Sequence, residues 1–184
     1  SIRPLRIRQK EEDKIIHEIK KHEREFLVQN IDDEEGRMKV VLILEEWIDE
    51  RDRGLIEDEW GVMEGDINGM CESAERILYA MRRIIAEDKD VIIKNKNSYQ
   101  TLVQAIDETY VRVKNGCKAD LIDLVSIKNI GRRRARQMIN ELSVESATDV
   151  SLLTERDRNK LADLSGWSQK LVDNIVNEAK RISK

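Results

Sequence analysis

The strongest constraint on the fold is a three-four recurrence of apolar residues over positions 67 to 85. These apolar positions are Ile67, Met70, Cys71, Ala74, Ile77, Leu78, Met81, Ile84 and Ile85. Because this spacing places all of them on one face of an α-helix, it predicts a long amphipathic helix whose apolar face is buried. Asp66, which follows Gly65, is expected to cap the N-terminus of this helix.

Shorter stretches with the same period predict further helices over residues 11–25, 38–48, 55–60 and 98–115, with an acidic loop over residues 30–36. No stretch of useful length alternates as a strand would. The composition agrees, because 38% of the residues are charged, 40% are hydrophobic and only one is Pro, a mixture typical of amphipathic helices. Trp47 and Trp60 are expected to lie in the core. We therefore predict an all-α fold.

A short segment between two predicted helices has the most specific pattern in the chain. Ile127-Lys128-Asn129-Ile130-Gly131 follows a short helix and leads into a second one, with Ala135 four residues after Gly131. This order resembles the helix-hairpin-helix pattern of an apolar residue, any residue, Gly, an apolar residue, Gly, three residues and Ala. Asn129 stands where the first Gly is usual, and the change is tolerable because Asn enters the left-handed region more readily than most residues.

The hairpin has the chemistry of a phosphate site. Gly131 lets the backbone approach a phosphate without a Cβ in the way, and the second helix points its free N–H groups and positive dipole end at that phosphate. Such contacts hold a nucleic-acid backbone without reading its sequence. The residues expected to bind DNA here are Lys128, Asn129, Ile130, Gly131, Arg132, Arg133, Arg134 and Arg136. The four Arg side chains together are predicted to provide most of the affinity.

The charge distribution supports this interpretation, although the net charge of −4 alone argues against a nucleic-acid binder. Residues 112–136 contain eight basic and two acidic side chains, so this stretch carries +6 and the remainder carries −10. A local basic patch in an acidic body is the electrostatic footprint of a phosphate partner. Arg112 and Lys114, at the start of the stretch, are therefore also expected to contact DNA. The alternative is an Arg-rich turn that only solvates the surface of a helical bundle.

A second copy of the hairpin pattern follows 37 residues later. Leu164-Ser165-Gly166-Trp167-Ser168 keeps the first Gly and replaces the second by Ser, and Leu171 and Ile175 continue the pattern. Paired hairpins of this kind pack as one compact unit. Because the second copy lacks the Arg cluster, we expect it to be mainly structural, with Trp167 in the core.

Three segments together resemble the C-terminal part of archaeal superfamily-two DNA helicases of the Hjm type, which are related to the helicase part of polymerase theta. They are residues 39–50 with Trp47, residues 60–75 from Trp60-Gly61-Val62 to Glu72-Ser73-Ala74-Glu75, and residues 112–136. The resemblance implies a helical ratchet-like domain over residues 1–115, whose long helix lies against single-stranded DNA. It also implies a small helix-hairpin-helix DNA-binding domain over residues 116–184, which grips the strand leaving the motor.

The resemblance also implies roles on the long helix. In the family this helix carries an Arg and a Trp, about two turns apart, that stack on bases, and the corresponding positions here are Gly69 and Arg76. Arg76 can stack or bind phosphate through its planar guanidinium, whereas Gly69 can do neither. Arg83, on the same stripe, is a further expected DNA contact. Arg76→Ala is predicted to weaken single-strand binding less than loss of the hairpin arginines.

The sequence contains no phosphate-binding Gly-x-x-x-x-Gly-Lys-Ser/Thr loop and no Asp-Glu-x-His run. We therefore expect this chain alone to be non-catalytic and to hold no cofactor, with ATP and Mg²⁺ bound by the motor of a longer protein of which it is a piece. The expected partners are single-stranded or branched DNA, the motor domains of the same full-length chain, and replication or repair proteins, but no membrane. No signal peptide or spanning segment is found, and the expected location is cytoplasmic and nucleoid-associated.

Two alternatives stay open. The chain could be a protein-docking domain of a DNA repair or replication complex, with its acidic N-terminal half as the partner surface. It could also be a hairpin-containing DNA glycosylase or nuclease, for which Asp149 is the one acidic residue at a suggestive distance. The surroundings of Asp149 are more typical of a helix start than of a catalytic loop.

Overall fold

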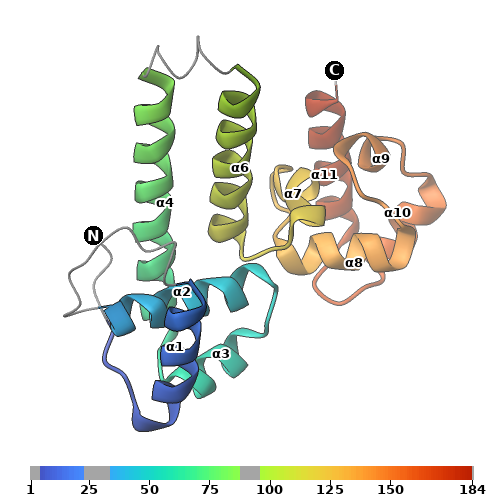
Figure 1. Cartoon of the computed structure of the whole chain (residues 1–184). Coiled ribbons are helices and arrows are strands. Elements are labelled where there is room, and N and C mark those ends of the chain that lie inside the picture. Colours follow the sequence, from blue (N-terminus) through green and yellow to red (C-terminus); the bar gives the residue numbers. More distant parts are fainter. Residues whose placement is uncertain (1–4, 23–33, 88–95, 184) are drawn as a thin grey trace. The chain divides into compact units, whose positions relative to one another are not determined.

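The computed structural model describes residues 5–22, 34–87 and 96–183, and its chain divides into two compact units, residues 1–116 and residues 117–184 (Figure 1). Every regular element in the described ranges is a helix. The predicted all-α fold is therefore confirmed. Each unit has its own hydrophobic core.

The first unit contains five described helices. They are α1 (Gln9–His22), α2 (Glu34–Ile48), α3 (Arg53–Trp60), α4 (Glu64–Glu87) and α6 (Lys96–Asn115). The core forms where α1, α2, α3 and the first half of α4 meet, around Ile15, Ile43, Trp60 and Ile67, all fully buried. Trp47 also lies in this core, so the prediction for both tryptophans is confirmed.

The ends of two predicted helices differ from expectation. α2 begins at Glu34, inside the predicted loop 30–36, because Glu34 and Glu35 place negative charge in its first turn, where the helix dipole favours it. The rest of that loop, and residues 23–25 of the predicted helix 11–25, lie outside the described residues. α4 begins at Glu64 and not after Asp66, whose carboxylate accepts a hydrogen bond from the Met63 backbone N–H at 2.9 Å.

The apolar face of α4 is buried along its first half only, which corrects the prediction of one continuous buried face. Ile67, Met70, Cys71 and Ala74 lie in the core. Further along, the apolar side chains are exposed on the described surface: Ile77 is 39% exposed, Met81 42% and Ile84 69%. α6 packs beside α4 (Figure 1), with Arg82 and Asp107 forming an ion pair of 2.6 Å between them, but it does not cover this stripe.

A buried ion pair ties the start of the chain to α2. The Lys39 ammonium and the Glu11 carboxylate are 2.6 Å apart, and the two residues are only 2% and 4% exposed. Lys39 also donates to the Arg6 carbonyl at 3.0 Å, and Glu11 accepts from the Arg8 backbone N–H at 3.0 Å. Burial raises the pKa of Glu11, but the hydrogen bonds from Lys39 and Arg8 outweigh it and leave this pKa below its ordinary value.

The second unit is made of short helices around one core. They are the 3₁₀ turn η2 (Ala119–Leu121) and helices α7 (Ile122–Val125), α8 (Arg132–Leu142), α9 (Ala147–Ser151), α10 (Glu155–Ala162) and α11 (Gln169–Ile182). α11 buries Val172, Ile175, Val176 and Ala179 against the rest of the unit. Both α9 and α10 begin with a capping box, in which Ser146 and Thr154 are the N-caps.

Gly116→Ala is expected to lower the free energy of unfolding of the chain by at least about 2 kcal/mol. Gly116 has φ +60 after the end of α6, and an added Cβ would overlap the Trp47 ring, whose Nε1–H donates to the Val113 carbonyl at 2.8 Å. Chemical denaturation followed by circular dichroism measures the change.

The matched control is Gly69→Ala, because Gly69 lies inside α4 and a Cβ there meets open space. This variant is expected to stabilise the chain by up to about 1 kcal/mol, the helix-propensity difference between Gly and Ala. Equal stabilities for the two variants would contradict the role assigned to Gly116.

Candidate nucleic-acid interface

The first hairpin turns between α7 and α8 and is anchored by two isoleucines. Ile127 and Ile130 are buried in the core of the second unit, and the Ile130 N–H donates to the Ile127 carbonyl at 3.1 Å. The Ile130 side chain therefore lies in the core, and the DNA contact expected at Ile130 stays a prediction. Between the two, Asn129 has φ +72, the left-handed conformation that its place in the pattern requires.

Gly131 forms the N-terminal cap of α8 in extended backbone, with φ −97 and ψ 173. No side chain caps the helix from this position, and a Cβ built on Gly131 would have nothing within 4 Å. Neither backbone conformation nor packing therefore explains the Gly. The open space beside Gly131 at the start of α8 leaves room for the close approach of a phosphate.

The basic side chains around this turn differ in their exposure and in their hydrogen bonds within the protein. Lys128 and Arg133 are exposed, and Arg132 is half-buried. Arg136 makes a two-pronged contact with Asp120, at 2.7 and 3.0 Å, and its hydrogen bond holds the pKa of that carboxyl below its ordinary value. The sequence gives no signal of this pairing, because 16 residues separate the two partners.

Arg134 connects the two hairpins. Its guanidinium donates to the Asn129 carbonyl at 3.0 Å and to the Gly166 carbonyl at 3.1 Å, and it lies 5.8 Å from the centre of the Trp167 ring. The Trp167 Nε1–H in turn donates to the Gln137 side chain at 2.8 Å. Trp167 is buried, as predicted.

The second hairpin repeats the backbone of the first. Gly166 has φ +84 where Asn129 has φ +72, and Ser168 caps α11 where Gly131 caps α8. The Ser168 hydroxyl accepts from the Leu171 N–H at 3.3 Å, so one first-turn amide of α11 already has a partner. When the two hairpins are aligned, the exposed Lys170 occupies the position that corresponds to Arg133. The sequence pattern alone did not identify Lys170 as a candidate contact.

The other expected DNA contacts belong to the first unit. On α4, Arg76 and Gly69 are exposed, and Arg76 donates to the Ser73 hydroxyl at 3.2 Å. Arg83 is exposed and forms an ion pair with Glu87 at 2.9 Å, which raises the pKa of Arg83 above its ordinary value. On α6, Arg112 is half-buried, 3.6 Å from Asp49, and Lys114 is exposed.

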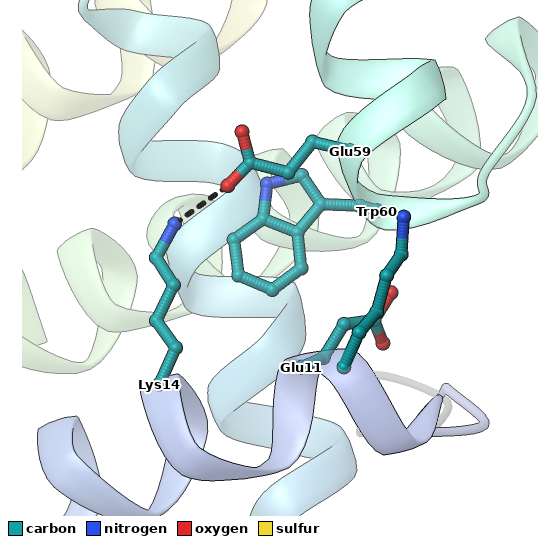
Figure 2. Close-up of a pocket in the computed structure, with 5 residues that line it drawn as sticks. Glu11, Lys14, Glu59 and Trp60 are labelled. Carbon is teal, nitrogen blue, oxygen red and sulfur yellow. Dashed lines mark hydrogen bonds and ion pairs between the residues drawn. The ribbon is translucent and has the colours of Figure 1, made fainter.

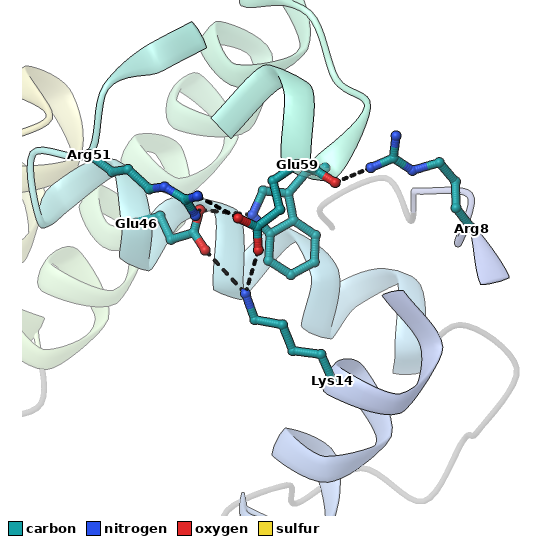
Figure 3. Close-up of polar contacts among 6 residues, drawn as sticks. Arg8, Lys14, Glu46, Arg51 and Glu59 are labelled. Atoms are coloured by element: carbon teal, nitrogen blue, oxygen red, sulfur yellow. Dashed lines mark hydrogen bonds and ion pairs between the residues drawn. The ribbon is translucent and has the colours of Figure 1, made fainter. Parts of the chain in front are cut away.

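A small pocket in the first unit is lined by charged side chains that already have partners. Figure 2 shows Lys14, Glu59 and Trp60 lining this pocket. The Lys14 ammonium lies 4.4 Å from the centre of the Trp60 ring and 2.9 Å from the Glu59 carboxylate. Arg51 bonds both Glu46 and Glu59 (Figure 3), and Glu46 accepts from the Trp60 indole N–H at 2.9 Å. The hydrogen bonds from Lys14 and Arg51 hold the pKa of Glu59 below its ordinary value. This network connects α1, α2 and α3. Because its charged groups already pair with one another, the pocket offers a ligand few polar groups to bind.

The enzymatic alternative gains no support from Asp149. Its carboxylate accepts from the Ser146 hydroxyl at 2.8 Å and from the Ser146 N–H at 3.0 Å, within the capping box of α9. The hydrogen bonds from Ser146 and Glu145 hold the pKa of Asp149 below its ordinary value, and Asp149 is the third-position partner of the Ser146 N-cap. Within the described part of the chain, no group of three acidic, His or Cys side chains could hold a metal, and no helix is long and apolar enough to cross a membrane.

Comparison with known proteins agrees with this architecture. The chain is 29% identical to the ATP-dependent DNA helicase Hel308 of Pyrococcus horikoshii over 138 residues, which is 75% of this chain and 18% of the relative. It is also 29% identical to the Hel308 proteins of Thermoplasma volcanium and Methanococcus vannielii, over 86% and 94% of this chain and 22% and 21% of those relatives. The chain thus spans about a fifth of the length of these curated relatives.

Two family models divide the chain between them. A model described as SAM-like helix-hairpin-helix tandem matches residues 120–181, which agrees with the two hairpins of the second unit. A model described as archaeal helicase, domain 4, matches residues 1–116. The resemblance to the C-terminal part of archaeal DNA helicases is confirmed, and the chain belongs to the archaeal helicase domain 4 family.

Proposed function

We propose that this chain is the DNA-binding, non-motor part of an ATP-dependent DNA helicase, and that it grips single-stranded or forked DNA through the phosphate backbone. The observation that carries the proposal is the N-cap of α8: Gly131 has no side chain to cap the helix, and a Cβ at this position would meet open space. Exposed Lys128 and Arg133 flank this position. The hairpin turn therefore combines backbone amides, the positive end of the helix dipole and basic side chains, as anion sites at helix N-termini do.

The binding mode follows from the kind of groups present. Backbone amides and flexible cations contact phosphate oxygens, which are the same at every nucleotide, so the grip is independent of sequence. A sequence-independent grip suits a helicase, because every nucleotide must pass the same site. Assisting or restraining the strand during unwinding is the role we assign to the hairpin unit, with ATP and Mg²⁺ bound by the motor of the whole protein.

The first unit is proposed to guide the strand along α4. Gly69, Ser73, Arg76, Ala80 and Arg83 form a stripe of small and basic residues on that helix, and all except the half-buried Ser73 are exposed. Arg76 is the side chain that can bind phosphate or stack on a base. We expect Arg76 to contribute less than the hairpin, because the stripe on α4 offers exposed side chains without converging backbone amides.

Protein docking is a second candidate function, and the exposed apolar residues of α4 favour it. Ile77, Met81 and Ile84 recur at helical spacing and are exposed among the described residues. The occupant we propose is the motor part of the same full-length protein, since the relatives are about five times as long as the matched segment. Docking to a motor and gripping DNA are compatible functions of the two units.

Fluorescence anisotropy of a labelled single strand and a labelled forked duplex, titrated with the chain at several salt concentrations, tests the proposal. We expect binding without sequence preference that weakens with salt, with a logarithmic slope of about −0.7 for each phosphate contacted on a single strand. Absence of binding even at low salt would contradict the proposal that this chain binds DNA by itself, and would favour protein docking as its function.

Gly131→Ala is expected to weaken DNA binding about tenfold, the equivalent of one lost charge-assisted hydrogen bond, and to lower stability by no more than about 1 kcal/mol because Ala is a poorer N-cap than Gly. The added methyl occupies the space where the phosphate approaches but touches no protein atom. Gly65→Ala is the control, because a Cβ there also meets open space, in the first turn of α4. Equal DNA affinities of these two variants would contradict the site.

A further inference from the structure

One side chain holds the two hairpin turns together. The Nη1 group of Arg134 donates to the carbonyl oxygen of Asn129, and its Nη2 group donates to the carbonyl oxygen of Gly166, 32 residues away from Arg134. The guanidinium also lies near the Trp167 ring, at 5.8 Å from its centre. Both terminal nitrogens of this arginine therefore have acceptors within the protein.

The two carbonyls occupy equivalent places in the two hairpins. Asn129 and Gly166 are the left-handed residues of their turns, with φ +72 and +84, and each lies two residues before the N-cap of the following helix. Because the guanidinium is planar and its two donors point in fixed directions, bonding both carbonyls sets the distance between the two turns. The Gln137–Trp167 hydrogen bond of 2.8 Å supports the same junction from the next turn of α8.

The second turn has features of its own that suit a backbone contact. A Cβ at Gly166 would meet open space, and Lys170 is exposed at the second position of α11, as Arg133 is at the second position of α8. Two turns held at a fixed distance can bind neighbouring phosphates of one strand with a smaller loss of entropy than two turns that move independently.

Resting on the proposed function, we propose that Arg134 is a positioning residue that fixes the two hairpin turns relative to each other, so that both contact the backbone of the same DNA strand. It does not supply a phosphate contact itself. The sequence alone suggests the opposite, because Arg134 lies in a run of arginines at the start of α8.

Arg134→Lys separates the two roles, because lysine keeps the positive charge but cannot place two separate nitrogens on the two carbonyls. We expect this variant of the full chain to bind a labelled single strand about fivefold to tenfold more weakly, nearly as weakly as Arg134→Ala, since the geometry and not the charge is lost. Arg156→Lys is the matched control and is expected to bind like the parent, because Arg156 is an exposed arginine of α10, outside both hairpin turns. Thermal unfolding of each variant checks that the unit stays folded.

Amide NMR spectra recorded during a DNA titration give a readout that loss of stability would not mimic. In the parent chain we expect the amide signals of both Gly131 and Gly166 to shift on adding DNA, whereas in Arg134→Lys only the Gly131 signal shifts. If Arg134→Lys binds as tightly as the parent and both signals still shift, the positioning role is overturned. If the parent chain shows no shift at all, the proposed function fails and this inference fails with it.

The side-chain signals of arginine give a test on the unaltered protein, which decides the matter even where a variant unfolds. We expect the guanidinium signals of Arg133 to shift on adding DNA while those of Arg134 keep the position they have in the free protein. Movement of the Arg134 signals toward those of phosphate-bound arginine would show that it leaves the two carbonyls for the strand, and would overturn the proposal.

Discussion

Replacing Lys128, Arg132 and Arg133 together by alanine is expected to lower the affinity for single-stranded DNA about 100-fold at low salt, because three charge-assisted contacts at roughly 1 kcal/mol each are removed. These residues lie in the hairpin turn and at the first two positions of α8. Arg134 and Arg136 are kept in this variant, because Arg134 bonds two carbonyls and Arg136 bonds Asp120, and both contacts support the fold of the unit. Anisotropy titrations at several salt concentrations measure both the affinity and the slope, which should fall by about 2 if three phosphate contacts are lost.

A control variant that loses the same number of positive charges elsewhere in the chain distinguishes the effect of losing DNA contacts from the effect of changing the net charge. Lys20 and Arg37 are exposed cations of the first unit, and Lys180 is an exposed cation in the last turn of α11; their joint replacement by alanine should change the affinity little. Arg76→Ala, on α4, should cost about threefold, the smaller effect of one exposed cation. Equal losses in the hairpin and control variants would contradict the hairpin site, and a larger loss from Arg76→Ala would make α4 the main contact.

Glu11→Leu is expected to destabilise the chain by about 3–5 kcal/mol, the usual cost of leaving one partner of a buried ion pair without its counter-charge. The Lys39 ammonium would remain buried with the Arg6 carbonyl as its polar partner, having lost the carboxylate 2.6 Å away. Denaturant unfolding followed by circular dichroism measures the change. The double variant Glu11→Leu/Lys39→Met should recover most of the stability, because it removes both charges and keeps the volume.

The pH dependence of stability gives a second readout of the same pair. The folded-state pKa of Glu11 lies below its ordinary value of 4.5, so its contribution is fully present above that value and is lost as the pH falls through the lowered folded-state pKa. The parent should therefore lose more stability on acidification than the double variant. If both lose the same amount below about pH 4.5, the Glu11 carboxylate does not contribute as described.

The sequence by itself determined the features that depend on local spacing. The three-four recurrence of apolar residues identified the helices, because an α-helix returns to the same face at that period whatever surrounds it. The two hairpin turns were equally readable, since the left-handed backbone at Asn129 and Gly166 depends on the residue type at a single position. A resemblance to archaeal helicases could be recognised for the same reason, from short segments whose order along the chain is visible.

Only the tertiary structure decided which of these groups remain available for function. Periodicity marks an apolar face but cannot show whether anything covers it, and Ile77, Met81 and Ile84 in the second half of α4 prove exposed among the described residues. Nor could the run of arginines reveal that Arg134 bonds Gly166 and that Arg136 bonds Asp120. These partners are 32 and 16 residues distant along the chain. Contacts at such separations depend on how the helices pack, which is a property of the whole core and not of any local stretch of residues.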